Sequence, residues 1–246
     1  MARFFVPREN IHESKAIVRG QELNHLRRAL RQKPGDRIIF FDNEGWEHEG
    51  ILRSYEHERG EIEILNSFRP GRESSLQVTL AQALGKGEKM DWVVEKSTEL
   101  GVASIVPFIS RHTVPRPDAR KIQARLERWK RIALSATKQC GRTQVPVVLE
   151  LADFHDLVSG SWDCELKLFL WEREPAHGLA QVREEKTRLK SLLLVIGPEG
   201  GFSPEEVSKA LASGFASVRL GQRILRTETA ALAALSIAQY LWGDMA

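Results

Sequence analysis

Five consecutive aliphatic residues, LLLVI at positions 192–196, run directly into the glycine-rich segment GPEGG at positions 197–201. An uninterrupted apolar run of this length is typical of a strand buried on both faces. The residues that follow, Ser203-Pro204-Glu205-Glu206, have the N-cap, the N1 proline and the acidic first turn of a helix. A buried strand, a short loop and a helix in this order predict an α/β domain built on a parallel sheet.

The same alternation of strand and helix occupies the chain after residue 75. Apolar runs predict further strands over residues 76–84, 102–108, 166–171 and 216–220. Apolar periodicity predicts helices over residues 88–100 and 118–139, and a helix that is apolar nearly all round over 227–242. The last helix is therefore expected to be buried in a core or in an interface.

The chain before this region has a different texture. Residues 37–42, 46–55 and 60–65 read as short strands, and a helix over 22–31 is expected to stop before Pro34-Gly35. Closely spaced short strands predict a small β-barrel or sheet module. Positions 67–75, rich in Pro, Gly and Ser, read as a linker. We therefore predict two domains, residues 1–72 and 73–246.

Composition limits the classes of protein to consider. A chain of 246 residues with 42% hydrophobic and 28% charged residues can bury a core without disulfides or structural metal ions. Its two cysteines, Cys140 and Cys164, exclude a disulfide framework, an all-cysteine zinc site and an iron–sulfur cluster. The seven histidines have no metal-binding spacing, so no metal is expected. No aliphatic stretch approaches the length of a membrane span or a leader, so we expect a cytoplasmic protein without a membrane partner.

Positive charge is concentrated in two segments, although the net charge is only +3. Residues 111–142 contain ten Lys and Arg against two acidic residues, and residues 19–37 contain six against two. A run of charge is usually a solvated helix face. Two basic segments, one in each predicted domain, favour binding to the phosphates of a nucleic acid.

The glycine-rich loop at 197–201 has two interpretations. Glycine marks tight turns as readily as ligand sites. Ligands of parallel α/β sheets bind at the carboxyl ends of strands, next to the free N–H groups of a helix start. Two nucleotide loops are excluded, because no GxxxxGK[ST] occurs and because Gly85-Lys86-Gly87 is followed by Met90 where the dinucleotide fingerprint requires glycine. Cys140 has basic neighbours but no adjacent histidine base, so a catalytic cysteine is the weaker reading.

A second strand, loop and helix follow at residues 220–230, LGQRILRTETA. Helix capping alone accounts for Thr227 as N-cap and for Glu228 in the first turn. It does not account for Arg223 and Arg226, because an arginine between buried elements requires a partner. The two arginines therefore favour a functional loop.

These two loops in this order resemble the signature of the bacterial ribosomal RNA small-subunit methyltransferase E family, which makes N3-methyluridine in 16S rRNA. The resemblance extends over nearly the whole chain. It includes residues 25–36, 95–102, 128–132 and 139–146.

The resemblance implies a PUA-like RNA-binding β-barrel followed by an α/β SPOUT domain with a C-terminal trefoil knot. It also implies a homodimer and S-adenosylmethionine as methyl donor, with S-adenosylhomocysteine as product. The cofactor is expected against Leu170, Gly197, Pro198, Glu199, Gly200, Leu220, Gly221, Ile224, Leu225 and Arg226. RNA is expected against Arg3, Arg27, Arg28, Arg31, Lys86, Lys138 and Arg142.

Neutral uridine N3 carries a proton and is a poor nucleophile, so methylation needs a base or a cation that stabilises the developing negative charge. Our hypothesis gives the cationic role to Arg226 and the role of base, or of a group that orients the base, to Glu228 or Glu199. The target base has to be unpaired, since N3 lies on its Watson–Crick edge.

The expected substrate is 16S rRNA in the assembled small ribosomal subunit. Two alternatives remain open at this point. One is a SPOUT methyltransferase that acts on tRNA or on another rRNA site. The other is a non-catalytic RNA-binding factor of ribosome assembly, which would leave the glycine-rich loops and Arg226 without a purpose.

Overall fold

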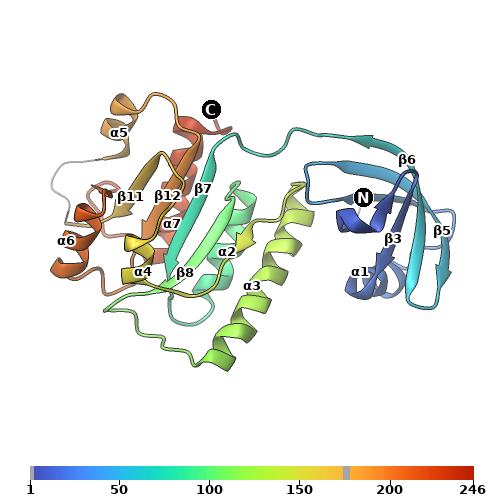
Figure 1. Cartoon of the computed structure of the whole chain (residues 1–246), viewed down its shortest axis with the longest axis horizontal. Helices are drawn as coiled ribbons and strands as arrows, with labels where there is room; N and C mark the ends of the chain where they lie inside the picture. Colours follow the sequence, from blue (N-terminus) through green and yellow to red (C-terminus); the bar gives the residue numbers. More distant parts are fainter. Residues whose placement is uncertain (1–2, 174–177) are drawn as a thin grey trace. The chain divides into compact units, whose positions relative to one another are not determined.

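The computed structural model describes residues 3–173 and 178–246. The chain divides into two compact units (Figure 1). Unit 1 comprises Met1–Glu73 and Thr137–Val145, and unit 2 comprises Ser74–Ala136 and Pro146–Ala246. In the described part of the chain, no helix has the length and apolarity needed to cross a membrane.

Unit 1 is built on a six-stranded sheet with the order β1-β4-β5-β6-β3-β2. Its strands are β1 (Arg3–Phe5), β2 (Ile11–His12), β3 (Lys15–Arg19), β4 (Arg37–Phe41), β5 (Glu47–Glu56) and β6 (Arg59–Phe68). The pair β1–β4 is parallel and the other pairs are antiparallel. Inward side chains such as Phe4, Phe40 and Leu52 are fully buried and form one core. The predicted small β module is thus present.

The structure differs from the helix predicted over residues 22–31. Helix α1 (Gly20–Asn24) starts earlier, and a π-helical turn (His25–Ala29) follows it directly. Both pieces bury one leucine, Leu23 and Leu26, against the sheet. The chain then leaves the helix at Arg31, which has a left-handed φ of 52°. The wider turn was not predictable, because a short helix with two apolar positions has no clear period.

Unit 2 contains a seven-stranded sheet in which every pair of neighbouring strands is parallel. Along the order β10-β8-β7-β12-β11-β13 the strands are Ala152–Asp153, Ser104–Ile109, Gln77–Ala83, Ser191–Ile196, Leu166–Leu170 and Ala216–Val218, with β9 (Val147–Val148) beside β8. The predicted parallel α/β domain is confirmed. Strand β12 lies between β7 and β11, so segments more than a hundred residues apart in sequence become neighbours.

Helices pack on this sheet. They are α2 (Lys89–Glu99), α3 (Ala119–Cys140), α4 (Phe154–Ser159), α5 (Leu179–Glu185), α6 (Pro204–Ala212) and α7 (Thr227–Trp242). Helix α6 starts with the capping box expected at Ser203, whose hydroxyl accepts from the N–H of Glu206 while the Glu206 carboxylate accepts from the N–H of Ser203. Helix α7 packs on β7, β12 and α2. The trefoil knot implied by the resemblance stays a prediction.

Candidate active site

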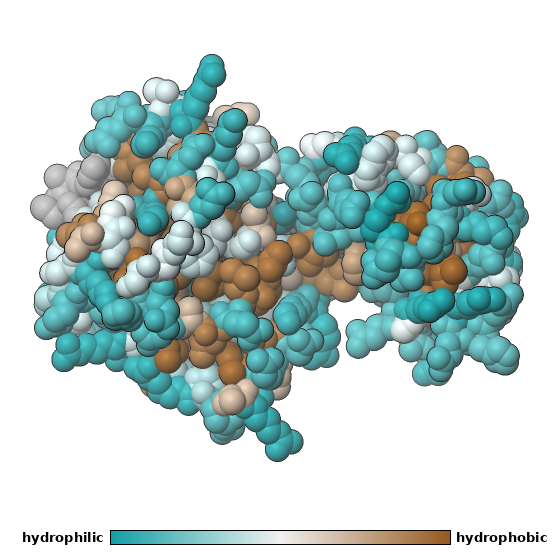
Figure 2. All heavy atoms as spheres, in the orientation of Figure 1, coloured by the Kyte–Doolittle hydropathy of each residue, from teal (hydrophilic) through white to brown (hydrophobic). Residues whose placement is uncertain are grey.

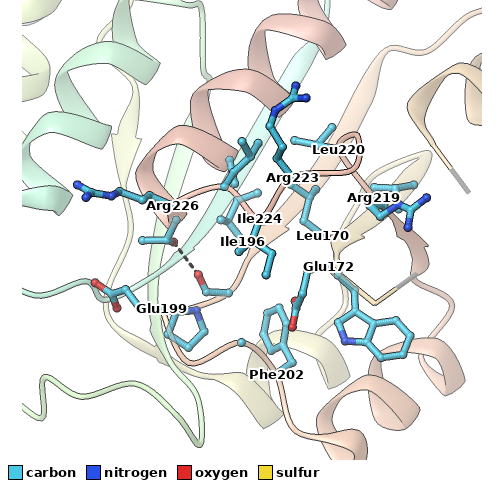
Figure 3. Close-up of a pocket in the computed structure, with 18 of the residues that line it drawn as sticks. Leu170, Glu172, Ile196, Glu199, Phe202, Arg219, Leu220, Arg223, Ile224 and Arg226 are labelled. Carbon is cyan, nitrogen blue, oxygen red and sulfur yellow. Dashed lines mark hydrogen bonds between the residues drawn. The ribbon is translucent and has the colours of Figure 1, made fainter. Parts of the chain in front are cut away.

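A cavity of about 430 Å³ lies at the carboxyl ends of three neighbouring strands (Figure 3). Its walls are the loops after β11, β12 and β13 and the first turn of α7. A parallel sheet brings these strand ends to one edge. The ten residues expected to contact the cofactor all line this one cavity: Leu170, Gly197, Pro198, Glu199, Gly200, Leu220, Gly221, Ile224, Leu225 and Arg226.

Two glycines of the loop after β12 are required by close packing. A Cβ on Gly197 would lie 2.7 Å from the Phe202 ring, and one on Gly200 would lie 2.8 Å from Cβ of His112. After β13, Gly221 adopts a left-handed φ of 68° with nothing within 4 Å of its would-be Cβ. Tight packing and turn geometry therefore explain these glycines without a ligand. The case for a ligand site rests on the cavity and on its polar side chains.

The arginines of the second loop are placed differently from the prediction. Arg223 and Arg226 are exposed rather than held between buried elements, so burial does not force a partner on them. Within the described residues, neither guanidinium has an ion-pair partner. Figure 3 shows Arg226 and Glu199 on one side of the cavity, and Glu172 and Arg219 on the other. Arg226 is thus a free cation at the edge of the cavity.

Thr227 does not cap helix α7 as expected. The N-cap position belongs to Arg226, which makes no side-chain cap, and Thr227 is the first residue of the helix. The buried Thr227 hydroxyl instead donates to the carbonyl oxygen of Gly197, at 2.6 Å, and accepts from Nε2 of Gln82, at 2.8 Å. It therefore joins the start of α7 to β7 and to the loop after β12.

The two candidate bases share one cation, the Lys89 ammonium. Lys89 Nζ lies 2.9 Å from Oε1 of Glu199 and 3.3 Å from Oε2 of Glu228. Glu199 lines the cavity, whereas Glu228 does not. Burial opposes ionisation of the Glu199 carboxyl, but hydrogen bonds from Lys89 and from the N–H of Lys86 outweigh it and lower its pKa.

Lys89 and Glu172 are two of the residues of this site that sequence reasoning missed. Lys89 starts α2 directly after the loop that follows β7, and β7 pairs with β12 in parallel. Glu172 directly follows the end of β11 and lines the cavity. The strand-end rule would have identified both, since each lies just beyond a buried parallel strand. What it needed in addition was the strand order.

The residues expected to bind RNA fall into two groups. Arg27, Arg28, Arg31 and Lys86 lie at the surface, with Arg27 stacked over the Tyr55 ring at 4.4 Å. The face of unit 1 visible in Figure 2 is mainly hydrophilic.

Three other candidates are engaged inside unit 1. Arg3 pairs with Glu47, Lys138 with Glu22, and Arg142 with Glu73, and their side chains are largely buried. Their positive charges are therefore already balanced by internal carboxylates. Arg3, Lys138 and Arg142 therefore help to hold unit 1 together, and their expected contact with RNA stays a prediction.

The chain matches two known families of domain. Residues 72–239 match the RNA methyltransferase domain, and residues 18–65 match the RNA methyltransferase PUA domain. Ribosomal RNA small subunit methyltransferase E of Bacillus subtilis (strain 168) is 32% identical over 247 residues, which cover 98% of this chain and 96% of that protein. The protein of the same name from Synechocystis is 33% identical over 237 residues, or 95% of this chain and 76% of that protein.

Two solved structures agree over the full length. A ribosomal RNA small subunit methyltransferase E from Neisseria gonorrhoeae, bound to S-adenosyl methionine, is 35% identical, with a TM-score of 0.87 and 100% coverage of both chains. A putative methyltransferase from Legionella pneumophila, in complex with the cofactor SAM, is 32% identical, with a TM-score of 0.89 over 99% of this chain and 98% of that one. The expected combination of a PUA domain and a methyltransferase domain is confirmed, and this chain belongs to the ribosomal RNA small subunit methyltransferase E family.

Proposed function

We propose that this protein transfers a methyl group from S-adenosylmethionine to N3 of one uridine of 16S rRNA, in the small ribosomal subunit and in the cytoplasm. The observation that carries the proposal is the cavity at the ends of β11, β12 and β13. It gathers all ten residues that the family resemblance associates with the cofactor. The relatives from N. gonorrhoeae and L. pneumophila, similar over the whole chain, were solved with this cofactor bound.

The side chains of the cavity fit S-adenosylmethionine. Leu170, Ile196 and Leu225 offer aliphatic surface to an adenine ring, and the glycines expose backbone groups that can bind its edges. Ile224 is 85% exposed although it lines the cavity, so a large apolar side chain is left for a ligand to cover. When bound, the cofactor supplies an electrophilic methyl on a sulfonium and leaves as the neutral thioether S-adenosylhomocysteine.

The protein's own side chains have to accept one proton and stabilise one developing negative charge. As the bond between uridine N3 and the methyl carbon forms, the N3–H bond breaks and the proton passes to a carboxylate, from which it leaves to water. Glu199 is our choice of acceptor over Glu228, because Glu199 lines the cavity. The free guanidinium of Arg226, on the same side, stabilises the charge on the uracil oxygens.

A second copy of the chain is part of the proposal. Helix α7 leaves Ile237 and Tyr240 at the surface, Tyr240 with 60% of its area exposed. Together with the family resemblance, these unpaired apolar side chains support a homodimer in which α7 faces its counterpart.

Mass spectrometry of rRNA tests the proposed reaction. Small subunits and naked 16S rRNA, each lacking the modification, are incubated with the protein and S-adenosylmethionine. We expect one added methyl on a single uridine, at N3, and preferentially in the assembled subunit. A methyl on tRNA or at another rRNA position would favour the alternative of a SPOUT methyltransferase with a different RNA substrate. Failure to bind the cofactor in calorimetry would favour an assembly factor without catalysis.

A further inference from the structure

The segment between β7 and α2, residues 84–88, leads to a lysine side chain that the proposed function does not use. It delivers Lys89, the first residue of α2, to the edge of the cavity. The Lys89 ammonium contacts two carboxylates that come from two other elements, Glu199 in the loop after β12 and Glu228 in the first turn of α7. One cation thus joins three segments that are remote in sequence.

The surroundings of Lys89 are shaped to hold it. A Cβ on the buried Gly85 would lie 3.2 Å from Cδ of Lys89 and 3.5 Å from Oε1 of Glu199, so glycine leaves the room in which both side chains lie. Oε2 of Glu228 is buried, and among the described residues it has no hydrogen bond and no cation within ion-pair distance other than Lys89. Without this lysine, the buried Oε2 atom of Glu228 would have no cationic partner among the described residues.

The hydrogen bonds to Glu199 are one-sided. Lys89 Nζ and the N–H of Lys86 both donate to Oε1, at 2.9 and 3.3 Å. No donor from another described residue bonds to Oε2 of Glu199. Oε1 is therefore fixed by two donors from other residues, and the N–H of Glu199 itself also bonds to the carboxylate.

We propose that Lys89 is a positioning residue, whose ammonium holds the side chains of Glu199 and Glu228 side by side and orients Glu199 toward the proton on uridine N3. This role rests on the proposed function, since it serves the proton transfer. The hydrogen bond to Glu199, and then the interaction with Glu228, raises the pKa of Lys89, so the ammonium stays charged and does not compete as a base.

The pH dependence follows from the sign of the shift. The Glu199 pKa is depressed, so the carboxylate stays ionised, and the rate holds, until the pH falls through that lowered value. Removing Lys89 leaves two carboxylates close together without their cation, which raises the pKa of Glu199. The acidic limb of the pH–rate profile then moves to higher pH.

The experiment compares Lys89→Met and Lys89→Arg with Lys96→Met. Lys96 lies on the same helix and is also held between two glutamates, Glu95 and Glu99, so it is a matched control. We expect K89M to lower kcat by about tenfold or more, since it disturbs a general base, and to move the acidic limb upward. K89R should keep the wild-type kcat and acidic limb, and K96M should change neither. Affinity for S-adenosylmethionine is measured in each variant, so that weaker cofactor binding is distinguished from slower proton transfer.

A second readout does not depend on activity. In protein labelled with ¹³C at glutamate carboxyl carbons, with Glu199 and Glu228 identified by their Gln variants, NMR titration should show the Glu199 pKa rising in K89M. If K89M does not fold, Gly85→Ala replaces it as the test. The added methyl crowds the aliphatic part of Lys89, so the Glu199 pKa should rise in this variant as well. An unchanged titration, or an equal change in K96M, overturns the role of Lys89. If the Glu199 pKa rises in K89M but the wild-type enzyme does not methylate uridine, the proposed function is refuted and the role of Lys89 toward Glu199 is not.

Discussion

Three consecutive residues at the start of α7 have three separate roles. Arg226 presents a free guanidinium at the cavity, Thr227 joins two buried segments by hydrogen bonds, and Glu228 pairs with Lys89. The side chains of Thr227 and Glu228 diverge because successive residues of a helix point about 100° apart, whereas Arg226 precedes the helix with extended backbone. Three neighbouring residues thus link the proposed substrate site, at Arg226, to the buried contacts of Thr227 and Glu228.

Arg226→Ala tests the first of these roles. Losing the cation that stabilises the developing uracil charge should lower kcat/KM by about 100-fold, the effect of removing one oxyanion donor in other enzymes. Methyl-transfer kinetics on small subunits measure it. Arg188→Ala, at an exposed arginine before β12 and so at the opposite edge of the sheet, is the control. If R226A has full activity and normal stability, Arg226 is not the stabilising cation.

Thr227→Val tests the second role. The change removes the bonds to Gly197 and Gln82 but keeps the shape of the side chain. The carbonyl oxygen of Gly197 loses this donor, while Nε2 of Gln82 keeps its bond to the carbonyl oxygen of Ala83. We expect a loss of about 1–3 kcal/mol in the free energy of unfolding of unit 2, measured by urea denaturation. Thr229→Val, at an exposed position two residues later, should have almost no effect. Equal stability of the two variants would mean that the Thr227 bonds contribute nothing net.

At the scale of elements, long patterns were predictable and short ones were not. The apolar runs predicted β7, β8, β11, β12 and β13, and periodicity predicted α2, α3 and α7. The two-residue strands β9 and β10 were missed because they are too short for a pattern.

The same limit applied to the site. The strand-end loops pointed to the cavity residues, but no local signal says that β7 pairs with β12. Lys89 and Glu199 therefore could not be brought together from the sequence. The burial of Arg3 and Arg142 was also hidden, because a count of charges does not reveal the carboxylates that pair with them.

At the scale of the whole molecule, a net charge of +3 coexists with a surface that carries unpaired arginines. Arg28 and Arg31 are exposed and have no ion-pair partner among the described residues. Arg28→Glu with Arg31→Glu should weaken rRNA binding and lower its salt slope by about one for each phosphate that the protein no longer neutralises. Filter binding at several salt concentrations measures this. Affinity for S-adenosylmethionine should not change, and unaltered RNA affinity would mean that RNA does not bind at this surface.

The second whole-molecule prediction concerns oligomeric state. Light scattering at micromolar concentration should give twice the monomer mass of 27.9 kDa. Tyr240→Glu, which places a charge on the exposed face of α7, should shift the mass to that of the monomer. A wild-type monomer would refute the dimer, and a dimeric Y240E would move the interface away from this helix.

The division of unit 1 into two stretches of sequence has a consequence for synthesis. Arg3 donates to the carbonyl oxygens of Thr137 and Arg142, at 3.3 and 3.0 Å, and Glu73 accepts from the N–H of Thr143 at 2.7 Å. Although the sheet of unit 1 ends at residue 68, these bonds cannot form until residue 143 has left the ribosome. During translation, the first stretch of unit 1 can form its sheet and the Arg3–Glu47 ion pair, but it lacks the bonds to residues 137–143 until that second stretch has been made.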